Sequence, residues 1–324
     1  ETDRFPGYGA VWPRQSLDAE LIGAAESAGA TVSFQSTARP IIEDDVVRGV
    51  RVECAGGTRE VYAEKVIVAT GAPGAVARDL GAVRVADEPF GLAIRSYVES
   101  PRHADDMLEA CLTLRDEHGT PVPGYGWMFP CGDGSVNIGV GALSTMKGFK
   151  SLNLNKLLAS YRATVEGSWS LGADIGKARA WRLPMSVVKR SGAGWMAVGD
   201  AAGLVNPMNG EGIDYGLESG MLAADEYLRD PVGAESRYDD AVGERFDAFL
   251  RTGRRFAFLI GHPFLLRTGL RVAVGTHSIA NITLQVMGNL VDGDTPGAAG
   301  RVLSFADRAL ALADPVLRKT RAKA

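Results

Sequence analysis

The residues best suited to chemistry lie within residues 194–212, where a short apolar run is followed by an acid and then by glycines. Residues 195–198 are apolar and few, as expected of a buried strand. Asp200 follows that run, at the strand end where open α/β sheets place their ligand contacts. Gly199 and the small residues 201–203 leave room beside it, so a ligand can approach the backbone closely.

The next segment, residues 206–212, contains Pro207, Asn209, Gly210 and Gly212, and we call it the glycine loop. It precedes a helix predicted over residues 213–228. The start of a helix carries partial positive charge and unpaired backbone donors, which favours an anionic ring or a phosphate. A turn in which glycine serves only tight packing is the alternative, so the pattern alone predicts a ligand site and leaves the ligand open.

The elements that must position this segment begin with a helix predicted over residues 14–28. Ser16 is its predicted N-cap, regularly spaced apolar residues give it one apolar face, and Gly29 ends it. Arg14 lies just before the predicted N-cap of this helix and can meet a phosphate, although the spacing fits a surface arginine equally well. Residues 31–35 alternate like a strand.

Hairpin strands are predicted over residues 41–53 and 59–68, broken at residues 43–45 and at residues 56–57. The second strand ends in a buried run at residues 66–68, which is followed by Ala69, Thr70 and Gly71. These small residues let the backbone pack against a cofactor or against a neighbouring strand.

A second region is predicted to form an antiparallel sheet, with strands at residues 91–98, 110–114, 126–130 and 135–143. A helix is predicted at residues 152–165, and a strand at residues 177–188 is predicted to return toward the segment around Asp200. Tyr125, Trp127 and Phe129 occupy every second position, so they share one face of a strand. On the pattern alone, core packing is favoured over a wall that faces a ligand.

The chain then predicts a long amphipathic helix over residues 237–258, apolar helices over residues 264–274 and 278–291, and a basic last helix. Two interpretations of this helical C-terminus stay open. It can be a cap on the substrate domain, or it can be an interfacial surface that admits a lipid from a membrane.

The stretch around Asp200 resembles the second FAD-binding motif of the p-hydroxybenzoate-hydroxylase-like flavoproteins. That resemblance implies that Gly199 and Asp200 hold the ribityl and pyrophosphate region of FAD. It also implies that the glycine loop, with Pro207, Asn209, Gly210 and Gly212, lies along the isoalloxazine. The pattern R-x-x-L-D that starts at Arg14 is similar to the same family, in which this arginine lies near the flavin, and the A-T-G of residues 69–71 marks the return of the chain to the FAD sheet.

A narrower resemblance is carried by Y-x-W-x-F-P at residues 125–130, followed by V-N-x-G-x-G at residues 136–141. Both are similar to motifs of the geranylgeranyl reductase family, in which the tyrosine and the tryptophan line the cavity beside the flavin. Tyr125 and Trp127 are therefore the implied catalytic residues. One departure is that the first proline of the family motif falls at Val122, with Pro121 and Pro123 on either side.

The resemblance implies an α/β fold with a partial, Rossmann-like FAD-binding domain over residues 1–88 and 191–230. An antiparallel substrate domain would occupy residues 89–190 and a helical region residues 231–324. A dinucleotide-binding protein should open with a strand, a G-x-G-x-x-G turn and a helix, which residues 1–13 do not show. We therefore expect the chain to be the larger, C-terminal part of a longer flavoprotein.

By this resemblance, reduced FAD transfers hydride to a C=C bond of an isoprenoid lipid or of a menaquinone side chain. NAD(P)H or another reductant would supply the electrons, and peripheral contact with the cytoplasmic membrane face is implied. Rival functions are an aromatic monooxygenase of the same fold, a flavin-dependent halogenase, whose W-x-W-x-I-P-type motif is not found, and a chain without catalytic activity.

The composition and net charge indicate which other classes of protein the chain does not resemble. The 324 residues are 46% hydrophobic and 23% charged, which is ordinary for a globular protein, and the net charge of -4 gives no reason to expect nucleic acid as a partner. The three cysteines and four histidines have no metal-ligand spacing, so no metal is expected, and a reduced cytoplasmic compartment is the simpler inference. No signal peptide or confident membrane span is predicted.

Overall fold

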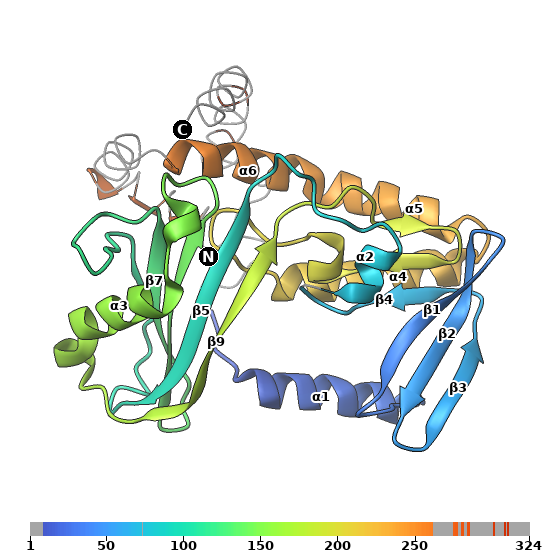
Figure 1. Ribbon diagram of the computed structural model, residues 1–324, viewed down its shortest axis with the longest axis horizontal. Helices are drawn as coiled ribbons and strands as arrows, with labels where there is room; N and C mark the ends of the chain where they lie inside the picture. Colours follow the sequence, from blue (N-terminus) through green and yellow to red (C-terminus); the bar gives the residue numbers. More distant parts are fainter. Residues whose placement is uncertain are drawn as a thin grey trace.

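The computed structural model describes residues 9–72 and 74–261, together with residues 275–277, 280, 281, 284, 285, 301, 308 and 310. The helices predicted over residues 264–274 and 278–291, and the basic last helix, lie wholly or mostly outside the described residues. The described residues form three sheets, with a helical layer that runs along one side of them (Figure 1).

The smallest sheet has the strand order β10-β11-β4, with β10 (Ser191–Gly192), β11 (Trp195–Ala197) and β4 (Val66–Val68). Strands β11 and β4 are parallel although far apart in sequence, while β10 and β11 form a hairpin. Parallel pairing requires a crossover between the strands, which confirms the predicted α/β class for this part of the chain. The prediction that residues 66–68 are buried is wrong at Ile67, whose side chain is exposed.

A three-stranded antiparallel sheet is formed by β1 (Thr37–Glu43), β2 (Val46–Cys54) and β3 (Gly57–Tyr62). The turn between β1 and β2 places Asp44 and Asp45 at φ 50° and 61°. Positive φ at both central residues is what a two-residue type I′ hairpin turn requires, and aspartate tolerates it. The predicted break at this position is therefore confirmed.

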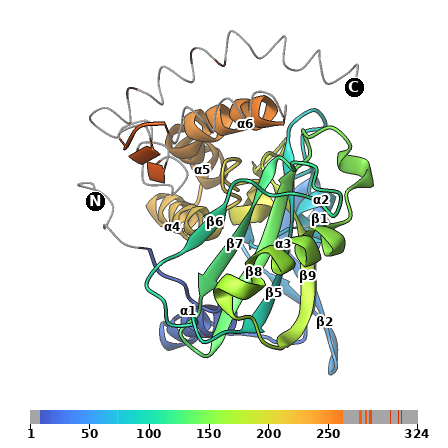
Figure 2. The same cartoon turned by 90° about the vertical axis from the view of Figure 1, so that its left-hand side faces the viewer.

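The largest sheet has five antiparallel strands in the order β6-β7-β8-β5-β9. Its strands are β5 (Phe90–Glu99), β6 (Glu109–Cys111), β7 (Gly124–Pro130), β8 (Ser135–Leu143) and β9 (Asp174–Pro184). Helix α3 (Leu154–Trp169), capped by the Asn153 side chain, covers one face, with the short 3-10 turn η1 (Phe149–Ser151) before it. Buried Met128, Ile138 and Tyr161 belong to the core between helix and sheet. Figure 2 shows α3 lying against the sheet.

The helical layer consists of α4 (Ile213–Arg229), α5 (Ala234–Val242), one turn of π-helix η3 (Gly243–Asp247) and α6 (Ala248–Ile260). It confirms the long helix predicted over residues 237–258, with the π turn inside it. A second core, which includes Met196, Tyr238 and Leu250, joins these helices to β11. The short helix α2 (Ala75–Asp79) contributes Ala77 to the same core.

Helix α1 (Arg14–Ser27) lies between the lower end of the five-stranded sheet and the β1–β3 sheet in Figure 1. The prediction that Ser16 is the N-cap is wrong, because the helix already begins at Arg14 and its N-cap is Pro13. No residue of α1 is buried, so the predicted apolar face is not part of a core within the described chain. Residues 31–35 form no strand, because no partner strand pairs with them. The strand predicted over residues 110–114 ends at Cys111.

Candidate functional site

The backbone at the end of β11 is shaped by two glycines. The chain leaves the strand into a 3-10 turn, η2 (Gly199–Ala202), with Gly199 at φ 58° and Gly203 at φ 69°. A Cβ on Gly199 would lie 3.1 Å from Cα of Gly216, a tight contact, and the positive φ also favours glycine, so glycine at this position lets α4 approach closely. The amide of Gly199 also donates to Oγ of Ser219 at 3.0 Å. The turn therefore follows a fixed path against the first half of α4.

Asp200 presents a half-buried carboxylate at this turn. Its side chain makes no hydrogen bond or ion pair within the described part of the chain. Burial raises its pKa, and the positive charge of Arg14 opposes that effect. A buried carboxylate without partners is costly unless a ligand satisfies it, so Asp200 is available to accept hydrogen bonds from hydroxyl groups.

Gly212 lies directly against that carboxylate. A Cβ on Gly212 would be 2.8 Å from Oδ1 of Asp200, so any larger residue would displace the acid. The predicted residues Gly199, Asp200 and Gly212 are therefore brought together by the structure. Arg14 begins α1 and pairs with Asp18 at 2.9 Å, and its charge is near enough to act on Asp200.

The glycine loop is held by its own hydrogen bonds. Asn206 is fully buried; its amide donates to the carbonyl of Glu211 and its carbonyl accepts from Gly210, both at 2.8 Å. Gly210 lies at φ 78°. Pro207 is buried and faces α6, where a Cβ on Gly253 would lie 3.0 Å from its Cδ. Pro207 thus anchors the loop to a helix, whereas residues 208–212 stay partly exposed.

The residue that the sequence did not single out is Glu211. Its Oε1 accepts from the amides of Ile213 at 3.0 Å and of Asp214 at 3.4 Å, so it caps α4. Burial and contact with Asp214 raise the pKa of Glu211 to about 8. The helix start that was expected to offer free donors is therefore already capped, by a carboxyl whose pKa burial and Asp214 hold well above its ordinary value. An acid placed immediately before a predicted helix was the available signal.

The aromatic residues of β7 lie on the face of the five-stranded sheet opposite α3, which we call the open face. Gly126, Met128 and Pro130 of β7 are buried, whereas Tyr125 and Trp127 are half-buried. Core packing, which the pattern alone favoured, is therefore wrong for these aromatic residues. The ring centroids of Tyr125 and Trp127 are 5.5 Å apart, and Phe129 continues the row at 6.1 Å from Trp127.

Two contacts position these rings. The hydroxyl of Tyr125 donates a short hydrogen bond to the carbonyl oxygen of Asn209, which joins β7 to the glycine loop, and burial raises the pKa of Tyr125 to about 12. Nε1 of Trp127 donates to Oδ1 of Asn137 at 3.0 Å. A Cβ on Gly139 would lie 2.1 Å from Cζ2 of Trp127, so the indole lies flat over that glycine. The predicted aromatic face and the predicted glycine loop thus meet at Tyr125.

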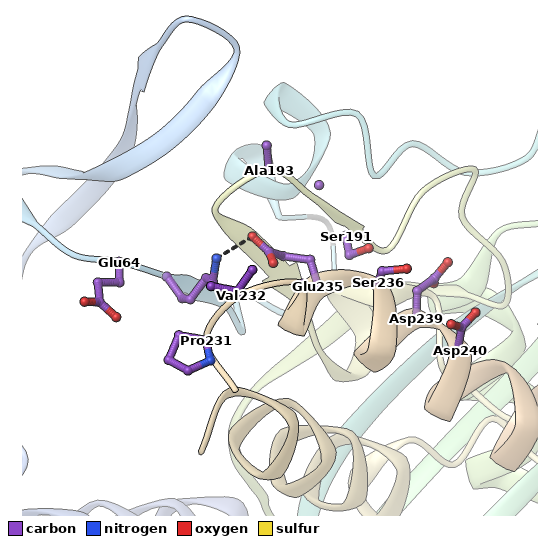
Figure 3. Close-up of a pocket in the computed structure, with 12 residues that line it drawn as sticks. Glu64, Ser191, Ala193, Pro231, Val232, Glu235, Ser236, Asp239 and Asp240 are labelled. Carbon is purple, nitrogen blue, oxygen red and sulfur yellow. Dashed lines mark hydrogen bonds and ion pairs between the residues drawn. The ribbon is translucent and has the colours of Figure 1, made fainter. Parts of the chain in front are cut away.

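A separate surface cavity of about 790 Å³ lies near the start of α5 (Figure 3). Lys65 and Glu235 form an ion pair there at 2.8 Å, and Glu64, Asp239 and Asp240 add negative charge. None of the residues predicted to bind the cofactor or the substrate lines this cavity. Its mostly acidic lining repels phosphate groups, so we place the candidate site between Asp200, the glycine loop and the open face.

Two further results concern the described residues alone. They contain no group of three or more His, Cys, Asp or Glu side chains arranged to hold a metal ion. Within the same residues, no helix has the length and apolar character needed to span a membrane.

Comparison with known proteins identifies close relatives in sequence. No protein-family model matches the chain. Menaquinone reductase of Mycobacterium tuberculosis (strain ATCC 25618 / H37Rv) is 37% identical over 300 residues, which cover 92% of this chain and 73% of that protein. Menaquinone reductase of Mycolicibacterium smegmatis is 36% identical over 310 residues. Digeranylgeranylglycerophospholipid reductase of Methanosphaerula palustris is 31% identical over 225 residues, or 67% of this chain.

Solved structures share the fold. A geranylgeranyl bacteriochlorophyll reductase-like protein from Thermoplasma acidophilum superposes with a TM-score of 0.70 at 22% identity, over 90% of this chain and 75% of that one. A variant of the flavin-dependent brominase Bmp2 gives a TM-score of 0.68 at 14% identity over 92% of this chain and 75% of that one. The resemblance seen in the sequence motifs is confirmed: the chain belongs to the geranylgeranyl reductase family of FAD-dependent oxidoreductases.

Proposed function

We propose that the protein uses reduced FAD to saturate a C=C bond in the isoprenoid chain of a quinone lipid of the menaquinone type. The observation that carries this proposal is the junction at Tyr125, where an aromatic face suited to an apolar chain meets the glycine loop. Similarity to mycobacterial menaquinone reductases over most of the chain supports the substrate class.

The residues around Asp200 fit FAD. A half-buried carboxylate without a hydrogen-bond partner among the described residues suits the hydroxyl groups of a ribityl chain, because an ionised carboxylate only accepts hydrogen bonds. Gly212 leaves space beside that carboxylate, which a Cβ would fill. We therefore assign FAD contacts to Arg14, Gly199, Asp200 and the exposed part of the glycine loop. The chemistry that bound, reduced FAD supplies is donation of hydride to carbon.

Tyr125 and Trp127 position and enclose the substrate in this proposal. With a pKa of about 12, the Tyr125 hydroxyl keeps its proton at neutral pH, and that proton is engaged by the carbonyl of Asn209. Tyr125 is accordingly a poor acid, and its role is to hold the aromatic face against the glycine loop. Trp127 offers a large apolar surface whose orientation is fixed by Asn137 and Gly139. Such a surface binds an alkene chain and excludes water.

The proposed partners follow from this chemistry. An isoprenoid lipid resides in a membrane, so we propose peripheral contact of the protein with the cytoplasmic membrane face. The reduced flavin must be regenerated, and we propose NAD(P)H or another reductant as the electron donor.

The test is anaerobic incubation of the FAD-loaded protein with dithionite and a fully unsaturated menaquinone, followed by mass spectrometry of the lipid. We expect a product that carries two additional hydrogens in its side chain. An unchanged lipid would contradict the proposal. A hydroxylated aromatic product formed with NAD(P)H in air would instead support a monooxygenase of this fold, such as the hydroxylases and halogenases that also superpose on the chain.

A further inference from the structure

Two arginines face the same side of the five-stranded sheet as the aromatic row. Trp127 on β7 is paired with Gly139 on β8, Gly139 with Arg95 on β5, and Arg95 with Arg179 on β9. Directly paired residues of antiparallel strands point to the same face of a sheet. Arg95 and Arg179 therefore both belong to the open face, in the row that contains the Trp127 indole.

Neither arginine has a counter-charge among the residues that the structure describes. Arg95 is half-buried and Arg179 is exposed, and neither forms a hydrogen bond or an ion pair within the described part of the chain. Arg190, which is also half-buried, is paired with Asp239 at 3.0 Å and with Asp247 at 2.6 Å. Like charges directly opposite each other destabilise a sheet, and a ligand that presents an oxygen atom to both guanidinium groups would offset that repulsion.

Aromatic side chains fix the guanidinium of Arg95 in place. Its Cζ lies 4.8 Å from the ring centroid of Tyr97 and 5.6 Å from that of Trp181. Stacking of this kind engages the flat face of a guanidinium and leaves its N–H edge free to donate. Rigid donors beside exposed aromatic surfaces match a flat ring that carries carbonyl oxygens better than they match a flexible phosphate.

We propose that Arg95, assisted by Arg179, binds a carbonyl oxygen of the quinone head group of the isoprenoid substrate. This inference rests on the proposed function, and it adds where on the open face the quinone head group of the substrate binds. Ala93 precedes Arg95 by two residues on β5 and is connected through Gly141 to Tyr125, which contacts the glycine loop. Two residues along a strand span about 7 Å. The head group at Arg95 thus directs the double bonds nearest to it toward the glycine loop.

The test measures binding without turnover. A 1,4-naphthoquinone with a short isoprenoid tail is titrated into the oxidised, FAD-loaded protein, and quenching of tryptophan fluorescence reports binding. Arg95→Met should weaken binding at least tenfold, about 1.4 kcal/mol, and Arg95→Lys should fall between this variant and the parent. The matched control is Arg182→Met: Arg182 lies on β9 but stacks over Phe90 at 4.7 Å, on the opposite face from Arg95.

Parent-like affinity in a folded Arg95→Met variant would overturn the proposal, as would equal losses in Arg95→Met and Arg182→Met. A second experiment adds inorganic pyrophosphate as a competitor. If pyrophosphate displaces the quinone from the parent protein, Arg95 and Arg179 bind an oxyanion, and the proposal that they bind the quinone head group is wrong. Arg95-dependent quinone binding in a protein that never reduces the side chain would retain this inference and reject the proposed function.

Discussion

At the scale of single residues, the site depends on polar groups that make no hydrogen bond or ion pair among the described residues. The carboxylate of Asp200 is the clearest case, because burial raises its pKa and only the charge of Arg14 opposes that effect. Such a group is costly in the empty protein and favourable once hydroxyl groups reach it. Arg95 is likewise a half-buried charged group, here positive, that forms no hydrogen bond or ion pair within the described part of the chain.

Asp200→Asn should lower the retention of FAD. The amide keeps the size of the side chain but loses the charge and one acceptor, and hydrogen bonds to charged groups contribute about 1.5–3 kcal/mol. We expect roughly tenfold or greater weakening, measured as the ratio of flavin to protein absorbance after gel filtration. Asp225→Asn, an exposed acid on α4, is the control and should retain the parental ratio. Equal ratios in all three proteins would remove Asp200 from the site.

Gly139→Ala should lower alkene reduction more than FAD retention. The new Cβ would be 2.1 Å from Cζ2 of Trp127, so the indole must leave its position on the open face. Gly141→Ala is the matched control on the same strand and face, because its Cβ would approach other atoms only at 3.8 Å or more. Turnover and flavin content of both variants are the measurements. Wild-type turnover in Gly139→Ala would show that the position of Trp127 does not matter to the reaction.

At the scale of elements, the junction of the glycine loop with α4 couples the site to pH. Glu211 caps the helix, and its pKa is about 8 in the folded protein against an ordinary value of 4.5. Because the folded pKa is the higher one, the contribution of Glu211 to stability is complete below about pH 4.5 and declines as the pH rises toward 8. Each pH unit in that window removes at most about 1.4 kcal/mol.

Glu211→Gln should abolish this decline while an amide oxygen still accepts from the helix amides. The stability of the parent relative to the variant should fall from pH 4.5 to pH 8 and level off above it, as measured by urea unfolding at a series of pH values. Glu166→Gln, an exposed position on α3, should leave the parental pH dependence intact. A pH-independent difference between parent and Glu211→Gln would contradict the raised pKa.

The sequence predicted an element correctly where neighbouring residues determine its conformation. The predictions were wrong where burial or strand pairing depends on a segment distant in the sequence. The β1–β2 turn and the helix after the glycine loop were predicted correctly, because residues such as Asp44 and Gly212 carry local signals. The alternation at Tyr125 and Trp127 showed that they share a face, but which face is buried depends on α3, a later segment that covers Met128 instead. Residues 31–35 alternate equally well and form no strand, because no other strand pairs with them.

At the scale of the whole molecule, the candidate site lies where two cores meet. The core under α3 supports the open face, and the core around β11 supports Asp200 and the glycine loop. The hydrogen bond from Tyr125 to Asn209 joins the five-stranded sheet to the glycine loop. Bonds from Thr145 to the carbonyl of Ala257 at 2.7 Å and from Arg254 to that of Met185 at 3.1 Å join α6 to the segments that follow β8 and β9. A ligand in the site therefore contacts both parts, so its binding should couple them.

FAD should raise the midpoint of thermal unfolding of the whole chain in a single transition. A ligand at a hundred times its Kd stabilises the folded state by about 2.7 kcal/mol. Tyr125→Phe removes the bond between β7 and the glycine loop, so we expect a smaller FAD-induced shift and a lower midpoint without FAD. Tyr227→Phe provides the control, because Tyr227 donates to Glu64 at the surface, at 3.0 Å. Both changes delete one hydroxyl. If the FAD-induced rise in the unfolding midpoint of Tyr125→Phe equals that of the parent, FAD stabilises the chain without the contact at Tyr125.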